Sequence, residues 1–288
     1  MKPLLHCKSR LLPRVARTLP RDLTPLRSAH SIKRLSALTQ SEPNVIALAV
    51  RWLASAQSVV AFTGAGVSAE SGLPTFRGPS GLWRNRRSET LATPEAFAAD
   101  PKTVWEWYNW RRSVHAGCAP NPGHHALAAL ERAKPGFCLV SQNVDGLHEQ
   151  AGSRRILKLH GDLWIVRCLS CGREARDTRV PIEPVPPYCA CGGMLRPAVV
   201  WFGESLSEET LRAAFDAASR ADLVLVVGTS SVVYPAAAIP RAALEHGARV
   251  IEINLEPTEL SSSAHLSLRG KTGELLLEVV RGAIGSAS

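Results

Sequence analysis

The feature that most constrains the fold is a set of five short apolar runs, each followed by small or polar residues. They cover residues 59–62, 137–140, 156–159, 223–227 and 250–253. Helix-like stretches lie between them, and apolar residues at helical spacing precede the first run over residues 43–58. Continuous apolar strands that alternate with helices are typical of a parallel sheet buried on both faces. The sequence therefore predicts an α/β fold with helices on both faces of a parallel sheet.

Two segments interrupt this alternation and predict a smaller second lobe. Residues 82–114 look helical and are rich in Trp, whereas residues 165–197 are rich in Cys, Pro and Gly. We interpret both as insertions into the larger α/β lobe.

Four of the seven cysteines form two local pairs, Cys168 with Cys171 and Cys189 with Cys191, separated by 17 residues. In a reducing compartment this spacing favours a zinc site over disulfides. Four thiolates can surround one zinc ion tetrahedrally and leave no open position, which predicts a structural zinc in the smaller lobe. The alternative is four reduced cysteines without metal.

Most of the positive charge lies at the N-terminus. The formal net charge is +9, but residues 1–37 contribute +8, with nine basic side chains and one acid. The rest of the chain is nearly neutral, so no basic stripe for nucleic acid is expected. An Arg-rich, acid-poor leader with interleaved leucines predicts a mitochondrial transit peptide over residues 1–36 and a folded domain over 37–288. The mitochondrial matrix is the expected location, with cytosol and nucleus as further ones, and a disordered basic tail is the alternative.

No membrane span is expected. The longest uncharged run, residues 223–240, is interrupted by Gly228 and Pro235 and is expected to be a buried strand that leads into a loop.

The first apolar run ends in a glycine-rich loop that begins Thr63-Gly64-Ala65-Gly66. Glycines directly after a strand let the backbone approach a pyrophosphate, and the following helix offers free N–H groups to it. Ala69 stands where the third glycine of G-x-G-x-x-G would be, which disfavours an ordinary dehydrogenase. A tight turn without a ligand is the alternative.

From this loop onward, the stretch GAGVSAESGLPTFRG resembles the signature of the sirtuins, the NAD-dependent protein lysine deacylases. Further motifs follow in family order over about residues 41–287: Gln142-Asn143-Val144-Asp145, Leu159-His160-Gly161, Val200-Trp201-Phe202-Gly203-Glu204, Gly228-Thr229-Ser230 and Asn254-Leu255-Glu256. The resemblance implies a Rossmann-like sheet with a smaller zinc-binding and helical lobe. It also implies NAD as co-substrate, one structural zinc ion and acylated protein lysines as substrates.

By similarity to sirtuins, two sets of residues bind the two substrates. NAD is expected at Gly64, Ala65, Gly66, Ala69, Glu70, Phe76, Arg77, Gln142, Asn143, Asp145, Gly228, Thr229, Ser230, Asn254, Leu255, Glu256 and Thr272. The substrate peptide is expected to pair as an added strand with Val200, Trp201, Phe202, Gly203 and Glu204. The zinc ligands would be the four paired cysteines, although the Cys-x-Cys pair is shorter than the commoner family spacing.

His160 is the expected general base, because it closes an apolar run, precedes a glycine and has a ring suited to proton removal near neutral pH. In the family mechanism the acyl-lysine carbonyl oxygen attacks the ribose carbon that bears nicotinamide. The histidine then activates a ribose hydroxyl, which captures the acyl group. The products are free lysine, nicotinamide and O-acyl-ADP-ribose.

The segment 104–112 resembles the class III branch of sirtuins, the desuccinylase type, in which a Tyr-x-x-Arg pair recognises an acidic acyl group. Tyr108 and Arg111 share a helix face, and a guanidinium can bind a carboxylate bidentately beside the phenol. Ala92 and Ala96 would leave room for a longer acyl chain. Malonyl-, succinyl- and glutaryl-lysine are the implied substrates. The alternatives are a helix packed only by its tryptophans, or Arg112 as the anion ligand.

We therefore expect a monomeric NAD-dependent demalonylase, desuccinylase and deglutarylase. Three alternatives stay open: a general deacetylase, a mono-ADP-ribosyl transferase that uses the same first step, and a catalytically inactive NAD-sensing module. Asn143, Asp145 and His160 argue against the inactive module.

Overall fold

The predicted parallel sheet is confirmed. The computed structural model describes residues 43–75, 82–84 and 86–285, all within a unit that spans Ser36–Ser288. Its six-stranded sheet has the order β11-β10-β9-β1-β4-β5, and every neighbouring pair is parallel. The strands are β1 (Ser58–Thr63), β4 (Gly136–Ser141), β5 (Ile156–Lys158), β9 (Leu223–Val227), β10 (Arg249–Asn254) and β11 (Leu266–Arg269).

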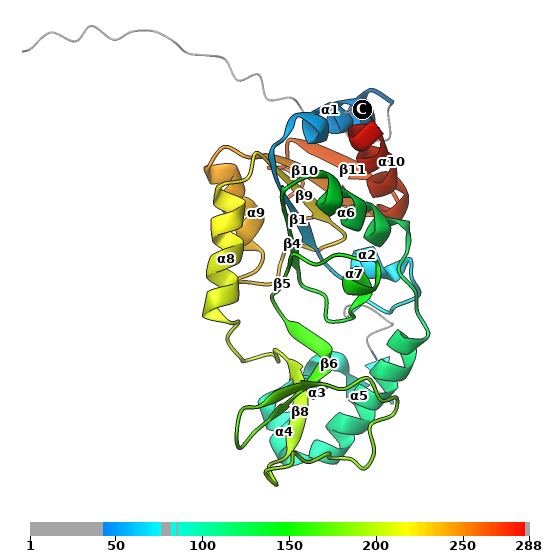
Figure 1. Cartoon of the computed structure of the whole chain (residues 1–288), viewed down its shortest axis with the longest axis vertical. Coiled ribbons are helices and arrows are strands. Elements are labelled where there is room, and N and C mark those ends of the chain that lie inside the picture. Colours follow the sequence, from blue (N-terminus) through cyan, green and yellow to red (C-terminus); the bar gives the residue numbers. More distant parts are fainter. Residues whose placement is uncertain (1–42, 76–81, 85, 286–288) are drawn as a thin grey trace, which may run out of the picture. The chain divides into compact units, whose positions relative to one another are not determined.

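Helices cover both faces of this sheet (Figure 1). One face packs against α1 (Pro43–Ser55), α6 (Pro122–Ala133) and α10 (Thr272–Gly285), and the other against α8 (Glu208–Ser219) and α9 (Ala238–Glu245). Successive side chains of a strand point to opposite faces. In β1, accordingly, Val59 and Ala61 join the core under α1, α6 and α10, whereas Val60 and Phe62 join the core under α8 and α9. Burial on both faces explains why the predicted runs are continuously apolar.

The smaller lobe is also confirmed. It contains α3 (Ser88–Leu91), α4 (Pro94–Ala99) and α5 (Pro101–Ala116), together with an antiparallel sheet in the order β7-β6-β8. Those strands are β6 (Gly161–Cys168), β7 (Glu174–Arg176) and β8 (Leu195–Val199). A third, Trp-rich core joins the helices to this sheet, with Trp105, Trp107 and Trp164 among its members. The segment predicted as helical also holds two short paired strands, β2 (Leu82–Trp83) and β3 (Arg86–Arg87).

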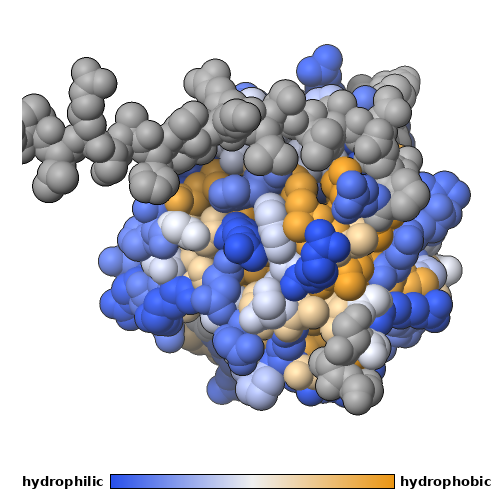
Figure 2. Space-filling model, turned by 90° about the horizontal axis from the view of Figure 1, so that it is seen from above, coloured by the Kyte–Doolittle hydropathy of each residue, from blue (hydrophilic) through white to orange (hydrophobic). Residues whose placement is uncertain are grey.

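The strand predictions for β1, β4, β9 and β10 are correct to within one residue at each end. β5 ends one residue earlier than predicted, and β11 was not predicted. Among the described residues, no helix combines the length and apolar character needed to cross a bilayer. Hydrophilic side chains line much of the margin of the face that Figure 2 shows.

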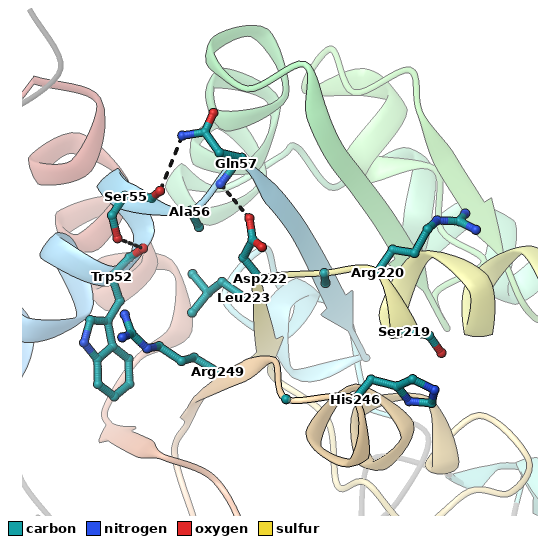
Figure 3. A pocket seen from close by; sticks show the side chains of 12 residues that line it. Trp52, Ser55, Ala56, Gln57, Ser219, Arg220, Asp222, Leu223, His246 and Arg249 are labelled. Atoms are coloured by element: carbon teal, nitrogen blue, oxygen red, sulfur yellow. Dashed lines mark hydrogen bonds between the residues drawn. The ribbon is translucent and has the colours of Figure 1, made fainter.

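A cavity of about 560 Å³ lies at the amino ends of β1, β9 and β10 (Figure 3). The carboxylate of Asp222 accepts hydrogen bonds there from the backbone N–H groups of Gln57 and Ser58, each over 2.8 Å. The Arg249 guanidinium lies 4.8 Å from the centre of the Trp52 ring. This cavity is at the opposite end of the strands from the glycine-rich loop, so it is not the predicted NAD site.

Candidate active site

The loops that follow β1 and β9 meet at the carboxyl end of the sheet. Gly66 donates its N–H to the Gly228 carbonyl over 2.7 Å, and Gly64 donates to Val227 over 3.1 Å. A Cβ on Gly228, where φ is +59°, would lie 2.4 Å from the backbone nitrogen of Val67. Only glycine fits this approach. The strand order reverses between β1 and β9, and such a switch point is where open α/β sheets bind dinucleotides.

Asn143 and Asp145, which follow β4, join the glycine-rich loop through Ser68 of α2 (Gly66–Ala69). The Asn143 side-chain amide donates to the Gly64 carbonyl over 3.1 Å and to the Ser68 hydroxyl over 3.2 Å. That hydroxyl donates to the Asp145 carboxylate over 2.8 Å. The structure thus brings both predicted residues together in one buried network, to which it adds Ser68.

Two histidines that the sequence analysis left without a role complete this network. The Nε2 atom of His124 lies 3.3 Å from the Ser68 hydroxyl, and that of His148 lies 3.1 Å from the Thr63 hydroxyl. Their ring centres are 4.8 Å apart. Burial lowers the pKa of each ring to about 3, so both are neutral near pH 7. His148 lies shortly after the Gln142–Asp145 motif, and this proximity is a sequence signal for a site residue. No local pattern marks His124.

On the other side of the loop, Thr229 connects two more predicted NAD residues. The Gln142 amide donates to the Thr229 hydroxyl over 2.9 Å, and the Asn254 amide donates to the Thr229 carbonyl over 2.9 Å. Ser230, Leu255 and Glu256 follow these anchors and are exposed. These predicted NAD residues therefore form an accessible rim that partly buried hydrogen bonds hold in place.

Glu70 connects the glycine-rich loop to α10. Its carboxylate accepts from the Thr272 hydroxyl and from the Gly273 N–H, each over 2.9 Å, at the N-terminus of that helix. A negative charge is stabilising at this end of a helix. Glu70 and Thr272, both predicted to bind NAD, thus contact each other, with Ala65 and Ala69 nearby in the loop and α2. Phe76 and Arg77 lie outside the described residues.

His160 lies in the turn between β5 and β6. Its Nδ1 atom is 2.9 Å from the Gln142 carbonyl, which can only accept, so Nδ1 carries the proton and Nε2 is left as the proton acceptor. Burial lowers the pKa of this ring, while the hydrogen bond to Gln142 raises it. A neutral ring with an available Nε2 is the form that a general base requires.

The predicted peptide-binding and acyl-binding residues lie beside His160. Val200 donates its N–H to the His160 carbonyl over 3.0 Å, and Phe202 donates to the Ala92 carbonyl over 2.9 Å. The Trp201 indole donates to the fully buried Tyr108 hydroxyl over 2.8 Å. These contacts join α5 to the segment that follows β8. That segment forms a turn rather than a strand, and its pairing with a peptide stays a prediction.

Arg111 lies on the same face of α5 as Tyr108, as predicted. Its guanidinium is 5.6 Å from the Tyr108 ring centre and 5.2 Å from that of Trp107. Burial lowers the pKa of Arg111 and raises that of Tyr108. Ala92 follows the end of α3, and Ala96, in α4, packs at the edge of the Trp-rich core.

Glu204 and Arg112 are charged side chains that stabilise the segments around Trp201 and α5. Glu204 pairs with Arg196 over 2.5 Å and accepts the Trp201 N–H over 2.8 Å, so its carboxylate fastens the turn that includes Gly203. Arg112, the alternative anion ligand, is 1% exposed and donates to the carbonyls of Leu163, Asp177 and Arg179. Arg112 therefore holds the smaller lobe together and does not serve as the acyl ligand.

The four paired cysteines converge as predicted. Cys168 and Cys191 have sulfurs 3.5 Å apart, those of Cys171 and Cys189 are 3.9 Å apart, and all four lie within 4.8 Å of one another. Tetrahedral zinc with bonds of about 2.3 Å needs sulfurs about 3.8 Å apart. The cluster therefore fits one structural zinc ion, and the short Cys-x-Cys pair is compatible with it.

Comparisons with known proteins agree with this geometry. Residues 64–235 match the model of the Sir2 family. NAD-dependent protein deacylase 2 of Pyrobaculum aerophilum is 55% identical over 229 residues, which are 79% of this chain and 92% of that protein. The chain belongs to the Sir2 (sirtuin) family. This sirtuin is also 50% identical to an NAD-dependent protein deacylase of Aquifex aeolicus, over 77% of this chain and 93% of the relative.

A solved structure described as a Sir2 homolog–NAD complex superposes on this sirtuin with a TM-score of 0.79 and 48% sequence identity, covering 83% of this chain and 94% of that one. The predicted enzyme class, an NAD-dependent protein deacylase, is confirmed by the family, its relatives and this likeness. NAD as co-substrate and acylated protein lysines as substrates follow from the same membership.

Proposed function

We propose that this sirtuin removes acidic acyl groups, namely malonyl, succinyl and glutaryl groups, from protein lysines. The products are free lysine, nicotinamide and O-acyl-ADP-ribose. The observation that carries the proposal is the hydrogen bond from the Trp201 indole to Tyr108, one helical turn from Arg111. It connects the Tyr-x-x-Arg face of α5 to the segment that also contacts His160 through Val200.

The chemistry of that face supports an anionic acyl group. Arg111 is only partly exposed, and its guanidinium lies against aromatic rings rather than in bulk water. A cation in a desolvated position gains from a carboxylate, which can accept two of its N–H groups at once. An acetyl group has no carboxylate and cannot make this contact, so binding energy from Arg111 would favour the acidic acyl chains.

The other residues of the region have compatible roles. Ala92 is buried where Phe202 donates to its carbonyl, and its methyl group would obstruct a long acyl chain less than a larger side chain would. His160 holds its proton on Nδ1 and presents Nε2 to accept a proton from the ribose hydroxyl that captures the acyl group. NAD supplies that ribose. Arg112 is occupied by three carbonyls, so Arg111 is the arginine of this helix suited to anion recognition.

A general deacetylase is the second candidate. It is favoured by a solved Sir2 homologue of 49% sequence identity, which is described as a complex with 2'-O-acetyl ADP ribose. The two candidates differ in one measurable respect. Removing the guanidinium should harm only the reaction in which a carboxylate has to be recognised.

The test is Arg111→Met, assayed with NAD on succinyl-lysine and acetyl-lysine peptides of one sequence. We expect kcat/KM for the succinyl peptide to fall about 100-fold or more, equivalent to about 3 kcal/mol, with little change for the acetyl peptide. Arg51→Met, an exposed arginine on α1, controls for the substitution, and His160→Tyr defines the inactive baseline. An equal or absent effect on both peptides would favour the general deacetylase.

We also propose that residues 1–36 direct this sirtuin to the mitochondrial matrix. The Arg-rich, acid-poor composition of the leader supports this location. A fluorescent protein fused after residues 1–40 should enter mitochondria, and a fusion with the arginines of the leader changed to Gln should not. Cytosolic fluorescence from both fusions would contradict the proposal.

A further inference from the structure

β10 contains a carboxylate that the chemistry described so far does not use. The Glu252 side chain is 0% exposed. A buried charge is unfavourable unless it is paired and hydrogen-bonded. Glu252 meets this condition, since its carboxylate accepts from the Arg269 guanidinium over 2.6 Å, the Ser261 hydroxyl over 2.6 Å and the Ser267 hydroxyl over 3.2 Å. It also accepts from the Thr258 hydroxyl.

These partners come from two parts of the chain that the carboxylate ties together. Ser267 and Arg269 belong to β11, where Ser267 is the register partner of Glu252. Thr258 and Ser261 belong to the connection between β10 and β11. We call these five residues the Glu252 network. One buried charge therefore holds both the next strand and the loop that leads to it.

The same loop begins with Leu255 and Glu256, which are predicted to bind NAD. Asn254, the last residue of β10, precedes this loop, and its side-chain amide donates to the Thr229 carbonyl, as described above. Arg269 reaches the loop from the other side, with a hydrogen bond to the Glu256 carbonyl over 3.4 Å and one to Ser261 over 2.7 Å. Leu255 and Glu256 are thus exposed residues, with the partly buried Asn254 amide on one side of them and the partly buried Arg269 guanidinium on the other.

We propose that Glu252 is a positioning residue for NAD: through Arg269 it sets the loop that carries Leu255 and Glu256. The proposal uses the NAD dependence of the family and is independent of the acyl specificity proposed above. Without the negative charge, Arg269 would lose its ion pair, and its Nε atom already lacks a hydrogen-bond partner among the described residues. The guanidinium would then have to move toward water and release the Glu256 carbonyl.

The test is Glu252→Gln in the full chain, with NAD binding measured by calorimetry and turnover measured on an acyl-lysine peptide. We expect the Kd and KM for NAD to rise about tenfold, as for loss of a hydrogen bond to a charged group. The peptide KM and the kcat at saturating NAD should stay within about twofold of wild type. A purely structural role would instead lower the melting temperature and the active fraction without changing the Kd for NAD.

Glu259→Gln is the matched control. Glu259 lies in the same connection but forms an exposed pair with Arg241, at 3.5 Å. The same chemical change there should leave NAD binding unaltered. An unchanged Kd in folded Glu252→Gln, or an equal change in both variants, would overturn the proposal.

A second variant decides the question if Glu252→Gln does not fold. Ser261→Ala removes one hydroxyl that bonds both Glu252 and Arg269 and leaves the ion pair in place. A rise of about threefold in the Kd for NAD supports the proposal, in line with the loss of ordinary hydrogen bonds. An unchanged Kd overturns it. Because both readouts concern NAD alone, a failure here is distinguishable from a failure of the acyl specificity.

Discussion

The Trp201 indole donates a hydrogen bond to the Tyr108 hydroxyl over 2.8 Å, although the two residues are 93 positions apart. Through it, the helix that carries Tyr108 and Arg111 contacts the segment between β8 and α8. The same segment bonds to His160 through Val200. One short stretch of chain therefore connects the residues proposed to recognise the acyl group with the proposed general base.

Trp201→Phe should weaken acidic-acyl selectivity. The substitution keeps an aromatic ring but removes the N–H that orients the Tyr108 phenol, at a cost of about 1 kcal/mol. We expect kcat/KM for a succinyl peptide to fall about fivefold, with a smaller loss for the acetyl peptide, in steady-state assays. Trp52→Phe, on the far side of the molecule, is the control. Equal losses on both peptides would show that the indole only packs.

Arg112→Met should destabilise the fold, in contrast to Arg111→Met. Burial lowers the pKa of Arg112, and removal of its guanidinium leaves carbonyls of Leu163, Asp177 and Arg179 without their donor. We expect a loss of about 3 kcal/mol or more in the free energy of unfolding, measured in urea. Arg111→Met should lose less than about 1 kcal/mol. Equal stabilities of the two variants would contradict these assignments.

The two buried histidines near Ser68 predict acid sensitivity. With folded pKa values of about 3, His124 and His148 stay neutral where the unfolded chain, with pKa values near 6.5, takes up protons. Their contribution to stability is therefore complete above about pH 6.5 and is lost as the pH falls toward 3. Within this window, each histidine lowers the free energy of unfolding by about 1.4 kcal/mol for every unit by which the pH falls.

His148→Gln measures this directly. Between pH 7.5 and 5.5, the wild-type free energy of unfolding should fall more steeply than that of the variant, by about 1.4 kcal/mol. Equal slopes for wild type and His148→Gln would contradict the assignment of a buried neutral ring.

The cysteine cluster predicts one zinc ion per chain. Cys171→Ser should lower the bound zinc, measured by elemental analysis, and should lower the melting temperature of the smaller lobe, because metal binding contributes folding energy. A strong chelator should do the same to wild type. Cys138→Ser, outside the cluster, should keep its zinc. Wild-type protein purified without a chelator and found free of zinc would contradict the prediction.

The sequence predicted the parts of the fold whose signal is local. Continuous apolar runs marked β1, β4, β9 and β10, because burial on both faces leaves no polar position in a strand. β11 is four residues long and includes Ser267 and Arg269, so its pattern resembles a polar loop. Ser267 is buried and Arg269 partly buried, and both hydrogen bond to Glu252 on the neighbouring strand, which the local pattern does not reveal.

The candidate site likewise contains some residues that a local sequence signal predicts and others that it does not. Glycines at a strand end and paired cysteines point to their chemistry from spacing alone. By contrast, the role of Arg112 depends on carbonyls more than 50 residues away, and that of His124 depends on Ser68 in another helix. Contacts of this kind appear only when the fold brings the segments together.

The most direct test of the proposed specificity is the wild-type ratio of kcat/KM for succinyl-lysine over acetyl-lysine, measured on one peptide sequence at saturating NAD. We predict a ratio of about 10 or more in favour of succinyl-lysine, equivalent to at least about 1.4 kcal/mol of additional transition-state binding. A ratio below one would contradict a carboxylate pocket at Tyr108 and Arg111, and this sirtuin would then be a general deacetylase.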